Sequence, residues 1–140
     1  MSALPKVAVP AGDADARPFW ESCARHAMAL QRCEDCGRFR YPPRPVCPHC
    51  LGERATWTPV AGTGTVYVQL GVYPRGKEST GEPFSLTMIE LDEGVRMWSN
   101  VLAAPDAVRI GDRVRITYAD TDGGALPRFT LEMAIPDADR

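Results

Sequence analysis

The sequence predicts a mainly β protein in which an N-terminal helix is followed by a rubredoxin-like zinc ribbon and then by a five-stranded OB-fold barrel. Two observations predict this order. Cys33 and Cys36 form one C-x-x-C pair, and Cys47 and Cys50 form a second pair after a spacer of ten residues. From residue 65 onwards, short runs of alternating apolar and polar residues are separated by turn residues. Paired C-x-x-C motifs are typical of zinc sites, and evenly spaced short strands are typical of small barrels.

Residues 15–31 have the pattern of an amphipathic helix, after a flexible tail that we expect over residues 1–14. Pro18 suits the first turn of a helix. The apolar residues that follow recur at spacings of one, three and four and would form one face: Phe19, Trp20, Cys23, Ala24, Ala27, Met28 and Leu30.

Cys23 is the one cysteine outside the paired motifs, and His26 follows it by three residues. A cysteine nucleophile with a histidine base is one interpretation of this pair. We favour a small core or interface residue, because nothing nearby in the sequence orients such a pair and cysteine packs well when buried.

Residues 32–55 are predicted to form the zinc ribbon. Two residues between cysteines allow a tight turn that brings both thiolates to within about 2.3 Å of one ion. Gly37 suits the backbone conformation needed after such a turn, and residues 41–45 supply a proline-rich turn between two short strands. Four thiolates complete a tetrahedral shell and leave no position for water or substrate. We therefore expect one structural zinc rather than a catalytic one.

Other interpretations of the four cysteines remain open at this point. Iron fits the same sulfur shell, and free cysteines or a redox pair are a further alternative. His49 lies inside the second pair and offers a possible replacement ligand. With all four cysteines present, we expect His49 on the surface.

Residues 56–135 are predicted to form the barrel, before a second flexible tail at residues 136–140. Residues 65–73 alternate with a period of two, so we expect their apolar members to share one buried face. Further strands are expected at residues 84–91, 95–102, 112–118 and 128–133, with turn signals between them. We favour an OB-fold over an SH3-like barrel. The expected buried face of the first strand consists of Val66, Val68, Leu70 and Val72.

The composition limits the classes of function. The chain has 140 residues, of which 44% are hydrophobic and 24% charged, and this balance is typical of a soluble globular protein. The net charge of −2 gives no overall attraction to a phosphate backbone. The start of the chain lacks a basic segment followed by an apolar run, and no run approaches the roughly 20 apolar residues that would cross a bilayer. We therefore expect a cytoplasmic protein with no membrane or nucleic-acid partner.

A series of motifs runs in a fixed order over residues 18–129. They are Pro18-Phe-Trp20, the two cysteine pairs with Gln31, Gly37 and Tyr41-Pro-Pro-Arg44, then Trp57, Gly62-Thr-Gly64-Thr-Val66, Glu90-Leu-Asp-Glu-Gly94, Ile110-Gly-Asp-Arg-Val114 and Pro127-Arg-Phe129. In these motifs and their order the chain resembles a known family, the bacterial and archaeal zinc-ribbon OB-fold proteins associated with acyl-CoA, long labelled a domain of unknown function. One departure is Leu51-Gly52, where the family often has glycine directly after the last cysteine.

The resemblance implies a partner subunit rather than a solitary enzyme. Members of the family form complexes with thiolase-fold enzymes, which include thiolases, acyltransferases and aldolases acting on CoA thioesters. It implies that this chain is a non-catalytic, zinc-binding accessory subunit that supports complex assembly and acyl-CoA binding. The larger subunit would carry out thiolytic cleavage or acyl transfer, for example in aromatic-compound degradation. The alternative is a thiolase-like retro-aldolase in steroid side-chain degradation.

Two regions are candidates for contacts with a partner or with CoA. Phe19 and Trp20 are large aromatics of the kind that anchor interfaces. Arg75 and Lys77 lie in a long loop over residues 73–83, where they can contact phosphates or an acidic surface. A local excess of arginine around the ribbon fits solvation, an acidic partner or phosphate equally well: Arg32, Arg38, Arg40, Arg44 and Arg54.

Two further functions stay open. OB-folds and zinc ribbons also bind single-stranded nucleic acids, and Tyr67, Tyr73 and Trp98 would be the aromatic platform for stacked bases. A free-standing acyl-CoA carrier or regulator would share the fold and the ligand. The sequence contains no Ser-His-Asp set or phosphate loop, and its two histidines offer few groups for acid-base chemistry near neutral pH.

Overall fold

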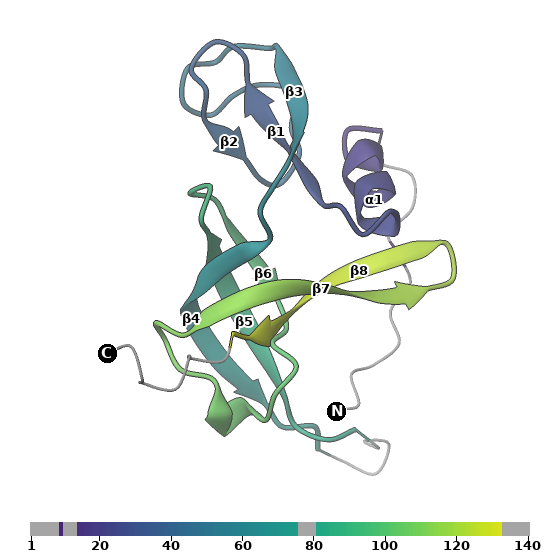
Figure 1. The fold of residues 1–140 in the computed structure, drawn as a ribbon, viewed down its shortest axis with the longest axis vertical. Helices are drawn as coiled ribbons and strands as arrows, with labels where there is room; N and C mark the ends of the chain where they lie inside the picture. Colours follow the sequence, from purple (N-terminus) through teal and green to yellow (C-terminus); the bar gives the residue numbers. More distant parts are fainter. Residues whose placement is uncertain (1–8, 10–13, 76–80, 133–140) are drawn as a thin grey trace, which may run out of the picture.

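The computed structural model describes residues 9, 14–75 and 81–132. One short helix, α1 (Arg17–Ala24), precedes a small three-stranded sheet and then a five-stranded sheet. Figure 1 shows the small sheet standing at one end of the molecule, with α1 beside it and the larger sheet below. The predicted mainly β architecture, with a ribbon before an OB-fold, is confirmed. No helix among the described residues is long and apolar enough to cross a membrane.

Helix α1 is shorter than the predicted range of residues 15–31. Pro18 lies in its first turn and Phe19 is buried, but the helix ends at Ala24. His26 then has a positive φ of 58°, and the Ser22 hydroxyl accepts the Ala29 N–H, so the chain turns back. Residues 29–31 belong to a strand, because pairing on both sides of this segment outweighs its helix-like spacing.

The ribbon sheet has the order β2-β1-β3, with all pairs antiparallel. It extends from residue 29 to residue 59, slightly beyond the predicted 32–55. Its strands are β1 (Ala29–Cys33), β2 (Phe39–Arg40) and β3 (Ala55–Pro59).

The larger sheet has the order β6-β5-β4-β7-β8 and curls into a partly open barrel. Val101, just after β6, makes a parallel bridge to Phe129 of β8, which brings the two edges of the sheet together. Each predicted strand has a counterpart in the structure. β5 has the predicted bounds, whereas the ends of the other strands differ from the prediction. The strands of this sheet are β4 (Thr63–Val72), β5 (Phe84–Leu91), β6 (Arg96–Ser99), β7 (Arg113–Thr121) and β8 (Gly124–Leu131), with a 3-10 turn η1 (Pro105–Ala107) between β6 and β7.

One buried cluster joins the helix and the ribbon to the barrel. Phe19 and Cys23 of α1 and Leu30 of β1 belong to the same cluster as Ile89 and Phe129 of the barrel. The Tyr118 hydroxyl accepts the Met28 N–H, which adds a polar contact between the same two regions. The position of the ribbon is therefore fixed by a shared core rather than by a flexible linker.

The prediction of one buried face along the first barrel strand is correct for Val66 and wrong for the three residues that follow it in the alternating pattern. Val66 is buried, but the pairing of β4 with β5 shifts between Val66 and Val68. Tyr67 forms this bulge, and the residues after it reverse their faces. Leu70 is consequently half exposed.

Candidate metal centre

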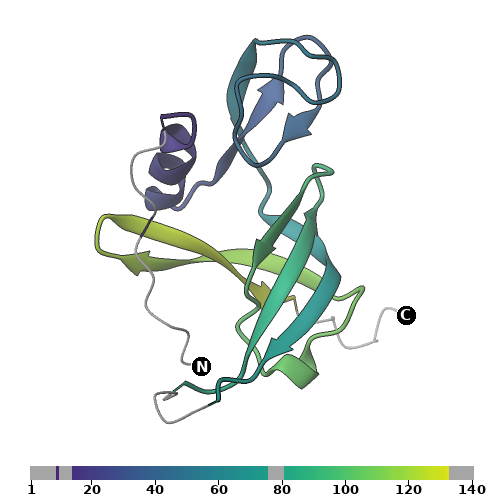
Figure 2. The same ribbon diagram turned by 180° about the vertical axis from the view of Figure 1, so that it is seen from behind.

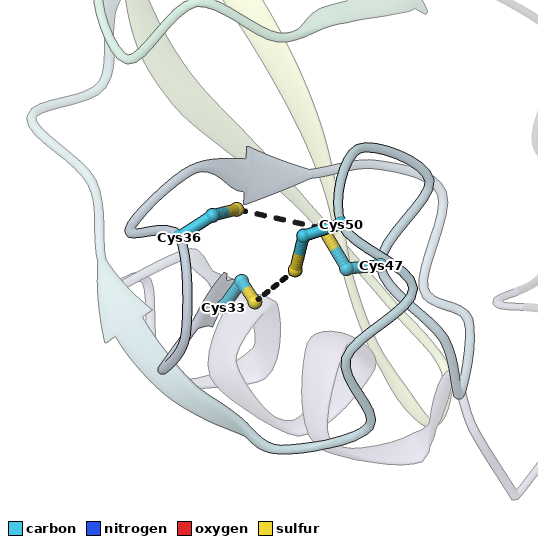
Figure 3. Close-up of side chains that lie close together, drawn as sticks. All are labelled: Cys33, Cys36, Cys47 and Cys50. Atoms are coloured by element: carbon cyan, nitrogen blue, oxygen red, sulfur yellow. Dashed lines mark hydrogen bonds between the residues drawn. The ribbon is translucent and has the colours of Figure 1, made fainter.

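The two C-x-x-C pairs bring four sulfur atoms together at the tip of the ribbon (Figure 3). All four Sγ atoms lie within 4.8 Å of one another. The Sγ atoms of Cys33 and Cys50 are 3.5 Å apart, and those of Cys36 and Cys47 are 3.7 Å apart. A tetrahedral ion with bonds of about 2.3 Å to sulfur requires S–S distances of about 3.8 Å. The described geometry therefore fits a single zinc-sized ion.

The turns that hold the cysteines are built alike. In each turn a backbone N–H two residues after the first cysteine points at its sulfur, from Asp35 to Cys33 and from His49 to Cys47, both at 3.4 Å. The Gly52 N–H points at the Cys50 sulfur at the same distance. Such donors stabilise thiolate charge, which a metal ligand must carry.

The pKa values of the cysteines reflect two influences, the backbone N–H groups around them and the closeness of the other sulfurs. The Cys36 N–H is the largest influence on Cys33 and lowers its pKa. Burial tends to raise the pKa of Cys47, but the N–H groups of Cys50 and His49 bring it down to about 6. For Cys50, the Gly52 N–H lowers the pKa, yet the neighbouring sulfurs raise it to about 12. Four thiolates this close repel one another unless a positive ion lies between them.

His49 is exposed at the surface, as predicted, and does not belong to the cluster of ligand atoms. Its Nδ1 accepts a hydrogen bond from Arg38 Nη1 at 3.0 Å. The four sulfurs complete a tetrahedral shell without it, so the arrangement suits structural zinc and leaves no site for a metal-bound water.

Cys23 and His26 do not form a nucleophile and base. Cys23 is fully buried, and this burial raises the pKa of its thiol to about 12. The His26 ring stacks on Tyr118, and its Nε2 lies 2.7 Å from Asp120 Oδ1. The prediction that Cys23 is a core residue is confirmed.

The other predicted contact residues are dispersed. Phe19 lies in the core, where its ring meets Trp20 edge-on at 4.9 Å, so only the half-buried Trp20 reaches the surface. Arg75 is exposed, and Lys77 lies outside the described residues.

The arginine cluster around the ribbon is largely used in local contacts. Arg54 pairs with Asp35 at 2.6 Å, and the Arg32 guanidinium lies over the Phe39 ring. Arg40 is buried, and its Nε donates to Gln31 Oε1 and to the Arg44 carbonyl. These contacts account for most of the positive charge within the ribbon itself.

The proposed platform for nucleic-acid bases is not assembled. Tyr73 packs against Gly71, on the inner side of the sheet, whereas Trp98 lies on the outer side. The Arg96 guanidinium covers the Tyr67 ring at 3.7 Å, and Arg96 is paired with Glu90. This geometry does not favour stacking of successive bases.

The sequence reasoning missed one surface, the outer side of β4 to β6, because it placed Val68, Leu70 and Val72 inside the barrel. The only signal of the error is Tyr67, an aromatic residue at a position expected to face solvent.

Most of the folded chain, residues 20–119, matches two family models. Residues 20–56 match the model described as "ChsH2, rubredoxin-like zinc ribbon domain", and residues 57–119 match "ChsH2, C-terminal OB-fold domain". A solved structure described as "Ltp2-ChsH2(DUF35) aldolase" has a chain that is 31% identical, with a TM-score of 0.78, and the match covers 88% of this chain and 98% of that one.

Two curated relatives are named as subunits of enzymes. A probable enoyl-CoA hydratase alpha subunit of Thermomonospora curvata is 32% identical over 84% of this chain and 36% of its own length. The benzoylsuccinyl-CoA thiolase subunit BbsA of Thauera aromatica is 30% identical over 61% of this chain and 59% of its own length. The chain thus spans little more than a third of the hydratase subunit and less than two thirds of the thiolase subunit.

Proposed function

Because the chain belongs to the ChsH2 (DUF35) family of zinc-ribbon OB-fold proteins, we propose that it is a non-catalytic accessory subunit of a cytoplasmic, thiolase-fold enzyme that acts on acyl-CoA thioesters. The observation that carries the proposal is the four-cysteine cluster. Its four sulfurs complete a tetrahedral shell and leave no position for a substrate. The larger subunit would supply the nucleophile and bases for thiolytic cleavage or acyl transfer.

The described residues support a non-catalytic role. The Cys23 thiol is buried and has a raised pKa, and His26 is engaged by Asp120. Neither is placed to act on a substrate. Two relatives are named as parts of a thiolase and of an aldolase assembly, which supports a role as a subunit.

We assign the cluster one structural zinc, held by Cys33, Cys36, Cys47 and Cys50. The ribbon has few buried apolar side chains of its own near its tip, where Cys36, Cys50 and Leu51 are exposed. Metal binding then provides much of the folding free energy of this region. The function of the zinc ion in the complex is to hold the ribbon in one shape, so that the chain presents a rigid surface to its partner.

A second candidate is the partner subunit of a thiolase-like retro-aldolase in steroid side-chain degradation. The observation that favours it is the solved chain of an aldolase assembly, which is 31% identical to this chain with a TM-score of 0.78. Both candidates share the role of accessory subunit and differ in the reaction of the partner.

The proposal predicts a thiolase-fold protein encoded beside this chain, and co-expression of the two tests it. We expect the two to co-purify, and the partner to need this chain for full activity in a thiolysis or a retro-aldol assay. The two candidates are distinguished by the assay, thiolysis or retro-aldol cleavage, in which the activity of the partner depends on this chain. Lack of both a complex and an effect on partner activity would refute the accessory role. Calorimetry of the isolated chain with CoA separately tests a free-standing carrier.

A further inference from the structure

The outer side of strands β4, β5 and β6 carries a continuous group of apolar side chains, which we call the apolar face. The strand register arranges it in three rows. Trp98, Met88 and Val68 form the first row, Leu86 and Leu70 the second, and Phe84 and Val72 the third. Leu70 is 50% exposed and Trp98 is 47% exposed.

Directly opposite the apolar face, the inner side of the same strands is polar. Ser85 and Thr87 are fully buried, and the Thr87 hydroxyl bonds to Gln69 Oε1 at 3.0 Å and to the Ser85 hydroxyl at 3.1 Å. Ser99 is also buried and donates to the Pro127 carbonyl. This part of the barrel is therefore inverted, with hydroxyl groups inside and large apolar side chains outside. A barrel that faced only water would gain nothing from this arrangement.

No described element covers the apolar face. Its seven residues belong neither to the buried core nor to the partly buried residues that pack against the core, within the part of the chain described. Helix α1 packs against β8 and β1 instead, and both views of the fold show it away from β5 (Figures 1 and 2). As far as residues 9, 14–75 and 81–132 are concerned, the face is thus open for another molecule.

The other half of the same outer side is charged. Arg113 binds Asp92 through two nitrogens at 2.8 and 2.9 Å, and Arg115 pairs with Glu132 at 2.8 Å. Tyr67, under the Arg96 guanidinium, marks the border between the two halves. The outer surface of the sheet therefore has two halves. One half carries charged side chains that are paired with each other and exposed to solvent, and the other half is apolar, as at the border of an interface.

The size of the apolar face indicates what binds there. Three strands about 4.8 Å apart and five residues at about 3.4 Å each give an area on the order of 250 Å². A stable interface buries about 800 Å² on each side. Two copies that met only through this face would fall well short of that area. The face has instead the size of the desolvated centre of a larger interface, in which a few aromatic and aliphatic residues contribute most of the affinity.

We propose that the apolar face is the docking centre for the thiolase-fold subunit, and that Trp98 and Leu70 are its anchoring residues. This inference rests on the proposed function. The bordering charges are already paired within the chain, so the partner surface that fits is an apolar one without a strong net charge.

The test compares three variants in the co-expressed complex. Leu70→Glu places a charge in the middle of the face, and Trp98→Ala removes its largest side chain. Ile110→Glu is the matched control, because Ile110 is an apolar residue of 71% exposure in the turn before β7. We expect the first two to weaken binding of the partner at least 30-fold and at least 10-fold, with the control unchanged. Thermal unfolding and metal content of each free variant establish that it is folded.

A wild-type measurement keeps the test independent of the variants. Oxidation of Met88 and Trp98 by hydroxyl radicals should fall at least several-fold in the complex, and oxidation of Tyr73 on the inner side serves as an internal comparison. If the wild-type complex forms but neither variant weakens it and neither residue is protected, the docking surface is refuted and the proposed function stands. If no complex forms, both fall. If the free chain is a dimer that Leu70→Glu dissociates, the face belongs to self-association and the proposal is wrong.

Discussion

Gly37 and Leu51 occupy equivalent positions in the two metal-binding turns, each directly after the last cysteine of its pair. Gly37 has a φ of 78°, and Leu51 has a φ of 65°. Each lies after a turn in which an N–H bonds to the carbonyl of the first cysteine, from Gly37 to Cys33 and from Leu51 to Cys47, both at 2.9 Å. The second turn therefore places a branched side chain in a left-handed conformation that glycine adopts freely.

Leu51→Gly should stabilise the protein by about 1 kcal/mol, because the substitution removes this strain. Leu51 is 74% exposed, so little packing is lost. Gly37→Leu is the matched reversal and should destabilise by a similar amount, since open space surrounds the added side chain and only the backbone is strained. Thermal unfolding of the zinc-loaded proteins measures both. A loss of stability in Leu51→Gly would contradict the argument.

Removal of one thiolate should unfold the ribbon. Cys47→Ser loses a buried ligand, and the remaining three sulfurs no longer complete a closed shell. We expect less than one zinc per chain by elemental analysis and a lower midpoint of thermal unfolding. Cys23→Ala is the control: it shortens a core side chain but should keep one zinc per chain. Full zinc content and full stability in Cys47→Ser would show that the cluster is not a structural metal site.

Gly64→Ala should be strongly destabilising, because Gly64 lies near the start of β4, where this strand pairs with β5 on one side and β7 on the other. A Cβ atom at this position would lie 2.6 Å from the Glu90 carbonyl oxygen and 3.1 Å from the Leu91 Cα. These are backbone atoms, so the strands must separate, at a cost of about 2 kcal/mol or more.

Gly71→Ala in the same strand is the matched control for Gly64→Ala. The nearest atoms to a Cβ at Gly71 are the end of the Tyr73 ring, which can rotate away. Its cost in chemical denaturation should therefore be clearly smaller. Equal costs for the two substitutions would mean that close approach of the backbones is not the reason for the glycine.

The metal centre and β5 could be predicted from the sequence because their signals are local. The spacing of Cys33, Cys36, Cys47 and Cys50 alone requires two tight turns around one point. Residues 84–91 alternate without interruption, and Ser85, Thr87, Ile89 and Leu91 are all buried. Here the sequence reasoning identified the strand but had no means to foresee that half of the inner side is polar.

The errors arose where contacts distant in sequence decide the backbone. Leu30 fits a helical spacing, yet pairing of β1 with β2 and β3 makes the segment around it a strand. The bulge at Tyr67 depends on how β4 pairs with β5 and with the segment before β7, so the one local signal, the aromatic Tyr67 itself, did not suffice to place Val68 and Leu70 outside. Both errors concern elements whose conformation is set by neighbouring strands.

The pH dependence of stability should report on the pair of Asp92 and Arg113. Hydrogen bonds from Arg113 and, secondarily, from Thr63 lower the pKa of Asp92 to about 2 from its usual value of 3.8. A carboxylate whose pKa is lowered by folding stabilises the native state above its unfolded pKa, and this contribution is lost as the pH falls from about 4 to about 2. Both side chains are more than 40% exposed, so solvent screening limits the contribution to less than about 1 kcal/mol.

Asp92→Asn tests this contribution by difference. At pH 7 the variant should be slightly less stable than the wild type in urea, and the difference should shrink towards zero between pH 4 and pH 2. Loss of zinc in acid affects both proteins alike and cancels in the comparison. The difference at pH 7 should also shrink in 1 M salt, where the screening length is about 3 Å. A difference that is the same at pH 7 and pH 2 would mean that the carboxylate stabilises the barrel through its shape and its contact with Thr63, and not through its charge.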